Sequence, residues 1–315
     1  MLLIDAHTSI GMDFWRKKVK KFPCKMDTTI LLKLMKKNGI EKSVILPAPT
    51  NKMLVCPNQS CQKRNKFLIL FKSFEKYYIL KCPICGSKVI IKNDPYNGKN
   101  KTILKASKKY KRKFIPFIAL DIRSPQAPKN LQKFLKTEKF FGVKIFSLTV
   151  FPHNFSKLMD TEFMDIANEN SLTLMFHSGI DYSSNPIYLV PLIKKYKNVN
   201  FIIAHCARFH KSFLKEIRKK RNVFVETSLI NLLSRGSLKY FNEFLSQEEK
   251  GAIKTVKGAY EFLIEQIGRE KVLFGTDIPA IDIADYEEHI NEFKKLPTEI
   301  IISAGYENTM RALNL

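Results

Sequence analysis

Eight short, nearly continuous apolar segments recur along the 315-residue chain, each with the length of a β-strand. Continuous rather than alternating hydrophobicity is typical of parallel strands that are buried on both faces. Amphipathic segments of helical length lie between them, and eight such repeats in about 250 residues predict a (β/α)8 TIM barrel. The predicted strands are 2–6, 43–48, 115–121, 142–147, 172–177, 199–205, 222–228 and 271–277, and the clearest helices are 28–38, 157–170, 187–196, 209–220 and 253–267. A doubly wound sheet is the alternative, but no glycine-rich phosphate loop follows the first predicted strand.

The connection between the second and third predicted strands is much longer than a βα unit needs. It contains four cysteines in two pairs, Cys56 with Cys61 and Cys82 with Cys85. We therefore predict a barrel made of residues 1–50 and 94–315, interrupted by an inserted zinc ribbon at 51–93. A basic helix over roughly 100–112 is expected to return the chain to the barrel.

The two cysteine pairs have the spacing of a four-cysteine zinc site, with twenty residues between them. Four thiolates complete a tetrahedron, so this zinc is expected to be structural, and it would supply folding energy to a module too small to bury much core. The residues between the pairs predict a β-hairpin. A redox role for Cys82 and Cys85 is the alternative, but nothing around them resembles a thioredoxin fold.

The chain carries a net charge of +25, and residues 51–113 hold 17 Lys and Arg against 2 Asp and Glu. Such a basic ribbon could bind nucleic acid. Its basic residues would pair with phosphates, and its aromatic residues would stack on bases. A small core with a solvated basic face is the other interpretation, and we favour it, with the ribbon capping the active site or joining subunits of a homo-oligomer. The interleaved residues are Lys63, Arg64, Lys66, Phe67, Phe71, Lys72, Phe74, Lys76, Tyr77, Tyr78, Lys81 and Lys88.

No apolar run is long enough to span a membrane, and the first residues lack the basic start and cleavage site of a signal peptide. Cysteines that have the spacing of a metal site and are not expected to form disulfides also fit a reducing compartment. We therefore expect a cytoplasmic protein with a small-molecule substrate and no membrane partner.

Three histidines and one aspartate close predicted strands one, five, six and eight: His7, His177, His205 and Asp277. In a barrel of this kind the carboxyl ends of the strands carry the chemistry. Neutral imidazoles and a carboxylate suit a divalent cation such as Zn²⁺, which lowers the pKa of bound water to about 7. Asp277 is placed to orient that water or accept its proton, and His205 to polarise a substrate oxygen or act as acid and base.

The chain resembles the amidohydrolase-related (amidohydrolase 2) family of metal-dependent TIM-barrel hydrolases and decarboxylases. The resemblance rests on IDAHTSIG (4–11), GVKIF (142–146), LMFHSG (174–179), VNFIIAHCA (199–207), VFVETS (223–228), LFGTDIP (273–279) and GYENTMRAL (305–313). It implies that His7, His177 and Asp277 are metal ligands and that His205 is the acid–base histidine beside the metal. The implied activity is hydrolysis or decarboxylation of a small carboxylated or carbonyl substrate.

Ser9 departs from the family pattern, which usually has a second histidine two residues after the first. A hydroxyl is a poorer zinc ligand than an imidazole. A catalytically degenerate barrel that serves as a binding module is therefore the alternative function.

Several further residues have weaker assignments. Lys144 ends strand four, where binuclear relatives use a carbamylated lysine, but we favour a substrate-carboxylate contact or simple packing. Ser9, Glu226 and Ser228 are further candidates for substrate contact. His153, His210 and His289 are expected to be solvated, Cys206 to pack inside, and Cys24 has no assignment.

Overall fold

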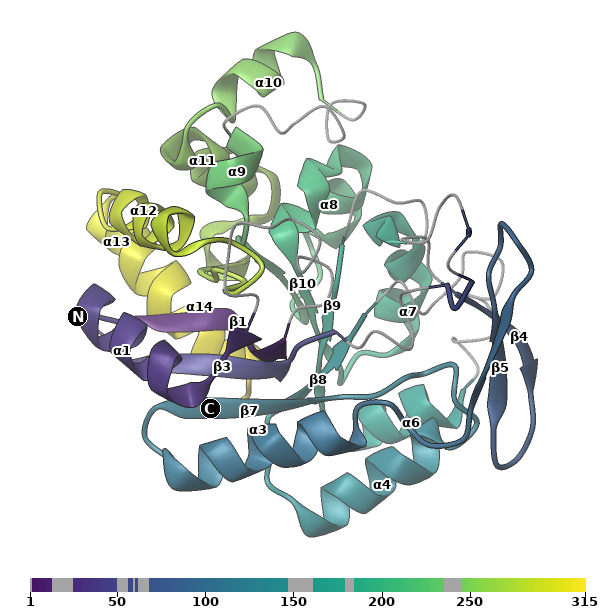
Figure 1. The fold of residues 1–315 in the computed structure, drawn as a ribbon. Coiled ribbons are helices and arrows are strands. Elements are labelled where there is room, and N and C mark those ends of the chain that lie inside the picture. Colours follow the sequence, from purple (N-terminus) through teal and green to yellow (C-terminus); the bar gives the residue numbers. More distant parts are fainter. Residues whose placement is uncertain are drawn as a thin grey trace.

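The chain folds into a closed parallel barrel surrounded by helices (Figure 1). This computed structural model describes residues 2–12, 25–49, 56–58, 60–61, 68–146, 161–178, 184–234 and 245–315. The strands of the barrel are β1 Ile4–Met12, β3 Lys42–Pro47, β7 Phe114–Ala119, β8 Gly142–Ile145, β9 Thr173–Phe176, β10 Asn200–Ile203, β11 Val223–Glu226 and β12 Val272–Leu273. Each pairs in parallel with its neighbour in chain order, and β2 (Lys25–Met26) adds an antiparallel extension to β1.

The first and last strands meet and close the barrel. Thr8 forms a parallel bridge with Ile278. The Ala6 amide donates to the Phe274 carbonyl at 3.0 Å, and the Ser9 amide donates to the Ile278 carbonyl at 2.8 Å. A doubly wound sheet has two open edges, so the (β/α)8 prediction is confirmed and the alternative is wrong. All eight predicted strands overlap the observed ones.

Successive side chains of a strand point alternately into and out of the barrel, and this divides the apolar residues into two cores. Val44 and Leu46 of β3 pack inside the barrel with residues of other strands such as Phe117 and Met175. Ile45, between them in sequence, belongs to the larger core between the barrel and its helices. This is the packing that a sheet buried on both faces requires, and it explains the continuous apolar runs.

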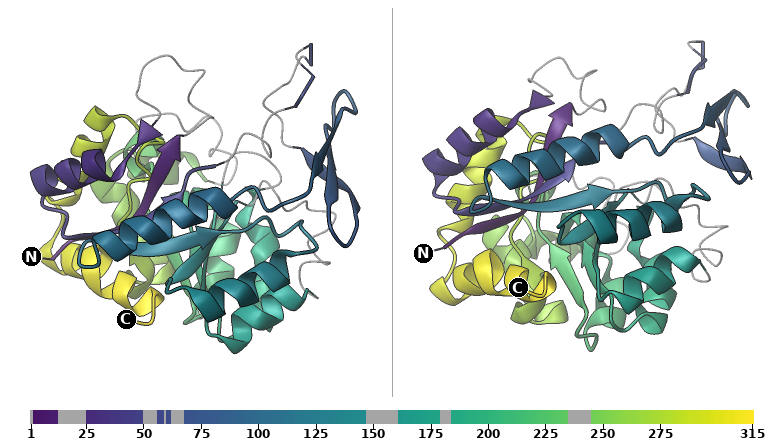
Figure 2. Two further views of the ribbon diagram at one scale, coloured as in Figure 1. Left: turned by 60° about the horizontal axis from the view of Figure 1, so that its bottom comes forward. Right: turned by 90° about the horizontal axis from the view of Figure 1, so that it is seen from below.

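The helices cover the outside of the barrel (Figures 1 and 2). Helix α1 has the predicted limits, because the Asp27 carboxylate caps its first amides and Gly39, with φ of 68°, ends it. The α-helices are α1 Thr28–Asn38, α3 Asn97–Lys109, α4 Ala127–Thr137, α6 Glu162–Glu169, α7 Val190–Lys195, α8 Lys211–Ile217, α9 Ile230–Ser234, α10 Gln247–Ala252, α11 Val256–Ile267, α12 Ile283–Phe293, α13 Thr298–Ile302 and α14 Asn308–Ala312. Shorter turns are η5 Pro186–Leu189, η6 His205–Phe209, η9 Arg269–Lys271 and η10 Ser303–Glu307.

The long connection between β3 and β7 contains a separate antiparallel sheet of β4 Ile69–Ser73, β5 Tyr78–Lys81 and β6 Lys88–Ile91. The predicted hairpin is confirmed as β4 and β5, and the predicted basic helix as α3. One face of this sheet packs on a small cluster of Cys56, Cys61, Leu68, Tyr78, Leu80, Cys82 and Ile91. The sheet projects on the side toward which the arrowheads of β1 and β3 point (Figure 2), so it stands beside the carboxyl-terminal end of the barrel.

A buried ion pair attaches this small sheet to the barrel. Asp121 follows β7, and its carboxylate accepts from the Arg123 guanidinium at 2.8 Å and from the Tyr78 hydroxyl of β5 at 2.5 Å. Arg123 also donates to the Leu68 carbonyl at 2.7 Å. Both charged side chains are almost completely buried. Their hydrogen bonds therefore hold the small sheet at a fixed place on the rim.

None of the helices in the described segments is long and apolar enough to cross a membrane.

Candidate active site

The strand-end residues predicted from the sequence come together at the carboxyl-terminal mouth of the barrel. His7 lies in β1, His177 directly after β9, His205 two residues after the end of β10 and Asp277 shortly after β12. His7 Nε2 lies 3.3 Å from Asp277 Oδ1, and His205 Nε2 lies 2.9 Å from His177 Nδ1. The rings of His7 and His205 are 5.4 Å apart. These contacts join positions up to 270 residues apart in the sequence.

Glu226, the last residue of β11, holds His7 in place. Its Oε2 accepts from His7 Nδ1 at 2.9 Å and from the Ser228 hydroxyl at 2.8 Å. The Ser228 amide donates to the other carboxylate oxygen. With its proton on Nδ1, His7 presents the unprotonated Nε2 toward Asp277, as a metal-ligating histidine requires.

A second run of hydrogen bonds leads from Glu226 to His177. Ser228 Oγ donates to the carboxylate and so accepts from His205 Nδ1, at 2.7 Å. His205 Nε2 then accepts from His177 Nδ1. One buried carboxylate therefore sets the tautomers of His7 and His205.

Burial keeps the imidazoles of His7 and His205 neutral. Loss of solvation, and next the charge of Lys144, hold the pKa of His7 well below its ordinary value. The pKa of His205 is also well below that value, first through burial and then through the neighbouring histidine His177. Burial raises the pKa of Glu226 to about 7, although the hydrogen bonds from Ser228 and the charge of Lys144 oppose the shift.

His7 and Asp277 have the spacing of two ligands of one divalent cation. Two ligands that bind one zinc ion at about 2.0–2.2 Å each lie roughly 3 Å apart, close to the 3.3 Å between His7 Nε2 and Asp277 Oδ1. His7, His205 and Glu226 also place one potential ligand atom each within 4.8 Å of one another. The Glu226 oxygen that faces His7 is already occupied by hydrogen bonds, which makes it an orienting group rather than a ligand.

Lys144 of β8 shares this space. Its Nζ lies 3.3 Å from His7 Nε2, the same distance as the Asp277 carboxylate. Burial lowers the pKa of Lys144 to about 8, against the opposing charges of Asp277 and Glu226. The ammonium also lies over the ring of Phe146, which stacks on Tyr96 with 5.5 Å between ring centroids. Two stacked aromatic side chains thus border Lys144.

Asp5 is a site residue that the sequence interpretation missed. It is fully buried, and its carboxylate accepts from the His7 amide at 3.1 Å and from the Thr276 amide at 3.0 Å. The Asp277 amide donates in turn to the His7 carbonyl. Asp5 therefore aligns the strand ends that carry His7 and Asp277. The sequence could have indicated this role, because Asp5 lies inside the apolar segment LLIDA and a buried charge in a strand needs hydrogen-bonding partners.

His205 lies in an unusual backbone turn. His205, Cys206, Ala207, Arg208 and Phe209 all have φ between 46° and 57°, and all five are buried. Right-handed conformations are strongly preferred by residues with a Cβ. This left-handed turn directs the chain sharply away from β10 and places the His205 ring toward His177 and Ser228.

The remaining predicted residues have mixed outcomes. Ser9 is buried two residues after His7 in β1, and Cys206 is buried as predicted. The prediction of solvated histidines is wrong for two of the three: His210 is buried and caps α8, and His289 is fully buried against Phe274. Their elements carry them inward, which the sequence alone does not show. His153 and Cys24 lie outside the described residues.

The four paired cysteines converge as their spacing predicts. Cys56 and Cys85 have sulfurs 3.4 Å apart, Cys61 and Cys82 have sulfurs 3.9 Å apart, and all four sulfurs lie within 4.8 Å of one another. Sulfurs around one zinc ion are about 3.8 Å apart, from a Zn–S distance of about 2.3 Å. Hydrogen bonds from Ser87 lower the pKa of Cys85 to about 6, whereas burial raises that of Cys56 to about 12.

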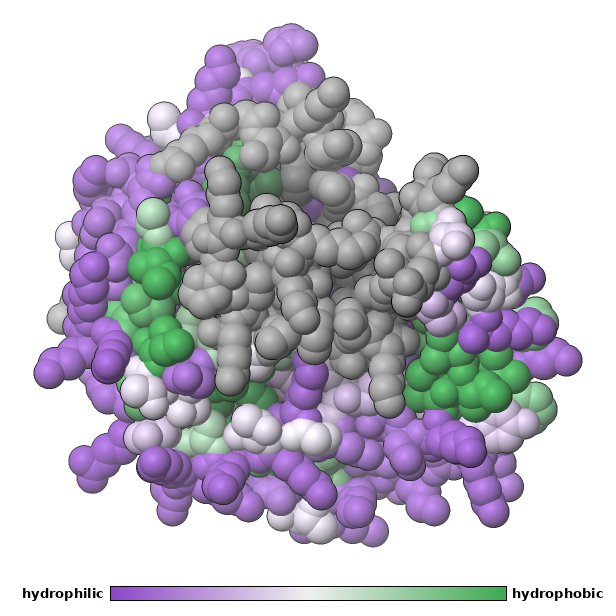
Figure 3. Space-filling view, viewed as in Figure 1, coloured by the Kyte–Doolittle hydropathy of each residue, from purple (hydrophilic) through white to green (hydrophobic). Residues whose placement is uncertain are grey.

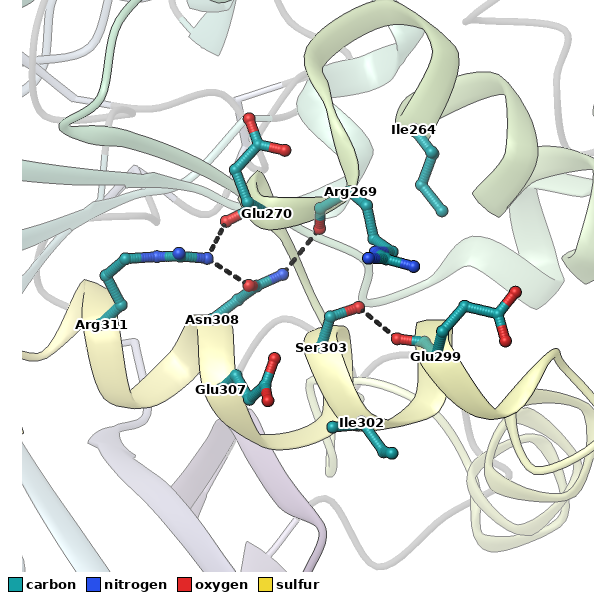
Figure 4. A pocket seen from close by; sticks show the side chains of 9 residues that line it. All are labelled: Ile264, Arg269, Glu270, Glu299, Ile302, Ser303, Glu307, Asn308 and Arg311. Atoms are coloured by element: carbon teal, nitrogen blue, oxygen red, sulfur yellow. Dashed lines mark hydrogen bonds between the residues drawn. The ribbon is translucent and has the colours of Figure 1, made fainter.

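A surface pocket lies at the opposite end of the barrel (Figure 4). Arg269 and Glu270, which line it, precede β12, whereas Asp277 follows that strand. The Arg311 guanidinium donates to the Glu270 carbonyl, and the lining carries both charge signs. This pocket is separate from the histidine cluster and offers no comparable set of reactive groups.

A closed parallel barrel with imidazoles and a carboxylate at its carboxyl-terminal mouth defines the class of metal-dependent TIM-barrel enzymes. A family model described as amidohydrolase matches residues 87–315. The match covers well over half of the chain, and the chain therefore belongs to the amidohydrolase family. This agrees with the predicted activity as a hydrolase or carbon–carbon lyase. No curated protein matches the sequence.

Solved structures share the fold at low sequence identity. An amidohydrolase from Burkholderia multivorans with bound zinc has a TM-score of 0.65 at 11% identity, over 100% of both chains. A probable 2-pyrone-4,6-dicarboxylic acid hydrolase from Acinetobacter baumannii, with citric acid bound, has a TM-score of 0.62 at 14% identity, over 100% of both chains. A 5-carboxyvanillate decarboxylase from Novosphingobium aromaticivorans, with bound manganese, has a TM-score of 0.62 at 12% identity, over 100% of this chain and 97% of that one.

Proposed function

We propose that the chain is a metal-dependent hydrolase or decarboxylase that holds one divalent ion, zinc by preference, with His7, His177 and Asp277. The observation that carries the proposal is the 3.3 Å approach of His7 Nε2 to Asp277 Oδ1, with Glu226 fixing the histidine tautomer. A bound ion of this kind makes hydroxide available at neutral pH and polarises a substrate oxygen.

Asp277 is the proposed proton acceptor. Its carboxylate is partly exposed, at 14%, whereas His7 is 2% exposed. It can therefore contact both the metal site and a bound molecule, and accept a proton from water or return it to a leaving group. His205 was expected to act on the substrate. Its hydrogen bonds to Ser228 and His177 favour the positioning of His177 instead, and the acid–base role stays a prediction.

Glu226 and Ser228 were expected to contact the substrate, but we propose that they orient the histidines instead. Both are fully buried, and both bond to the histidines. We assign them the orientation of His7 and His205, an arrangement in which a carboxylate and a hydroxyl fix metal-ligand rings.

A small carboxylated molecule is the proposed substrate. The Lys144 ammonium, beside His7 and over the Phe146 ring, can pair with a substrate carboxylate next to the metal. Two proteins with this fold have carboxylated molecules in their names, a dicarboxylic acid hydrolase and a carboxyvanillate decarboxylase. Ser9, near the mouth of the barrel, stays a candidate for substrate contact.

The four cysteines are proposed to hold a structural zinc ion in a ribbon module spanning 51–93, inserted into a barrel of residues 1–50 and 94–315. Support comes from sulfur distances that match one tetrahedral ion. Four metal-binding thiolates require reducing conditions, in keeping with the proposed cytoplasmic location.

Metal analysis of the purified protein tests the proposal. We expect two metal ions per chain in the parent, one after His7→Ala, and one after Cys82→Ser. The two variants should lose different ions, since one site is in the barrel and the other in the ribbon. A parent that holds one ion, retained by His7→Ala and lost by Cys82→Ser, would refute the barrel metal.

A degenerate barrel that acts as a binding module is the second candidate. It is favoured by Lys144, whose ammonium lies as close to His7 Nε2 as Asp277 does and would repel a cation. Ser9→His distinguishes the two. If the variant gains a tightly held barrel ion that the parent lacks, the native site is degenerate. If the parent already holds that ion, serine is a tolerated replacement.

A further inference from the structure

The solvent-facing side of the ribbon sheet differs from its buried side. Strand pairing places Lys81 opposite Lys88 and Ile79 opposite Ile90. Their neighbours Tyr78 and Leu80 point to the other side, into the small cysteine-containing core. Phe71 of β4 is 40% exposed and Ile90 is 58% exposed. We call Phe71, Lys72, Ile79, Lys81, Lys88 and Ile90 the outer ribbon face. In Figure 3, hydrophobic and hydrophilic side chains lie together at the edge of the molecule where β4 and β5 are found.

Three ammonium groups gather around one aromatic ring on this face. The Nζ atoms of Lys72, Lys81 and Lys88 lie 5.7, 5.3 and 4.7 Å from the centroid of the Phe71 ring. Cation–π attraction holds such groups near the ring, but it does not neutralise them. None of the three lysines forms an ion pair with any residue that the structure describes. Glu75, at the tip of the hairpin, is the one acidic residue in the sequence from 51 to 93.

Apolar and aromatic side chains are exposed beside this charge. Ile90 is among the most exposed large hydrophobic side chains in the described parts of the chain, and Phe74 is 41% exposed and stacks on Tyr77 at 4.5 Å. Solvation of a basic face does not explain why isoleucine and phenylalanine side chains are exposed beside it. The face therefore matches a partner that carries repeated negative charge and flat apolar surface together.

We propose that the outer ribbon face binds single-stranded nucleic acid. Phosphates would pair with Lys72, Lys81 and Lys88, and bases would lie against Phe71 and Ile90. Single strands expose both groups at once, whereas a duplex hides its bases in the stack. A second copy of the chain is a poor occupant, because two basic faces repel each other.

Binding of a labelled 20-nucleotide oligo(dT) and its RNA counterpart across a salt series tests the proposal with the full-length protein. The key variant replaces Lys72, Lys81 and Lys88 with Gln. The control variant replaces three exposed lysines elsewhere, Lys33, Lys36 and Lys219, and so loses the same charge. We expect the slope of log K against log salt to fall by about 2 in the key variant, at about 0.7 per lost single-strand phosphate contact. The control should keep the slope of the parent.

The apolar part of the face has its own test. Phe71→Ser should weaken binding by about tenfold or more while leaving most of the salt slope, because base stacking contributes little to counterion release. Unchanged bound zinc and circular dichroism would show that each variant keeps its ribbon folded.

Three outcomes would overturn the proposal. These are no binding of either oligonucleotide at about 50 mM salt, equal losses in the key and control variants, or tighter binding to phosphatidylserine vesicles than to the oligonucleotides with the same dependence on the three lysines. The last outcome would make the face a lipid surface. All of these readouts are independent of the barrel metal and of turnover.

Discussion

The hydroxyl of Thr276 donates a 2.7 Å hydrogen bond to the Asp5 carboxylate, and this contact ties the end of the last barrel strand to the first. Thr276 directly precedes Asp277, and Asp5 lies two residues before His7. The two proposed metal ligands are thus held in register by a bond that neither of them makes.

Thr276→Val should loosen that register. Valine keeps the shape of threonine but leaves a buried Asp5 oxygen without its donor, a loss of about 1–3 kcal/mol in folding free energy. We expect metal affinity at the barrel to fall about 10–100-fold, the usual effect of losing a group that supports a ligand. Metal titration and denaturant unfolding measure the two effects. Thr102→Val is the matched control, because that hydroxyl bonds only to the carbonyl one helical turn before it in α3. An equal fall in metal affinity in the control would refute the positioning role of Asp5.

Asp277→Asn should abolish turnover and leave the fold intact. The amide keeps the size of the side chain, but it cannot accept a proton and is a weaker ligand for a divalent ion. We expect a loss of about 100-fold or more in kcat, in the range of general acid–base catalysis. A panel of small aromatic and aliphatic carboxylic acids and lactones provides the assay. Glu299→Gln, at an exposed position of α13, controls for the lost charge. An unchanged rate on a substrate that the parent turns over would remove Asp277 from the mechanism.

Lys144→Met distinguishes the roles proposed for that lysine. Methionine removes the charge and retains most of the length. If Lys144 pairs with a substrate carboxylate, the KM rises, and metal binds more tightly because a nearby positive charge has gone. We expect an increase of about tenfold in metal affinity, corresponding to about 1.4 kcal/mol. Loss of metal in the variant would instead show that a modified Lys144 is itself a ligand.

The ribbon metal should control attachment of the ribbon to the barrel. Cys82→Ser removes one of four sulfurs, and without the ion the small cluster around Tyr78 cannot support its own fold. We expect faster proteolysis between residues 51 and 93 and release of the bond from Tyr78 to Asp121. Limited proteolysis with mass analysis follows the change. Cys206→Ser, at a buried cysteine of the barrel, should leave the cleavage pattern of the ribbon unchanged.

Stability should depend on pH through Asp94. Burial raises the pKa of this carboxyl to about 7 from an ordinary value of 3.8. Between these values the folded chain binds a proton that the unfolded chain has released, so stability falls as pH rises through this range and is lowest above pH 7. Asp94→Asn has no ionisable group at this position, so its stability should not fall in this way as pH rises. From pH 5 to pH 8 the variant should gain about 3 kcal/mol relative to the parent, at about 1.4 kcal/mol for each pKa unit. Parallel unfolding curves at each pH measure the difference, and a constant offset between the two proteins would contradict the shift.

The sequence predicted the barrel because strand and helix periods are local properties. Because the strands are buried on both faces, each has a nearly continuous apolar sequence. Helix α1 has the predicted limits because Asp27 and Gly39 cap it. The order of the strands followed from chain order, since parallel strands joined by helices pair with their neighbours.

The finer structure of the site could not be predicted in this way. That His7 and Glu226 share a hydrogen bond depends on strands one and seven, which flank the last strand, directing these side chains into the barrel at the same level. The burial of His289 depends on which side of α12 meets Phe274. The outward position of Phe71 depends on a register shift between β4 and β5. Each is a relation between distant segments, and residue type alone does not reveal it.

The left-handed turn from His205 to Phe209 has a consequence for heat inactivation. Five residues with a Cβ in this conformation cost about 1–2 kcal/mol each, together comparable to the whole stability of an ordinary domain. Burial of all five side chains offsets that cost only while the surrounding packing is complete. The turn therefore gains free energy from relaxing, and local opening there would displace His205 before the strands separate. Activity should be lost on warming at a lower temperature than the global unfolding transition.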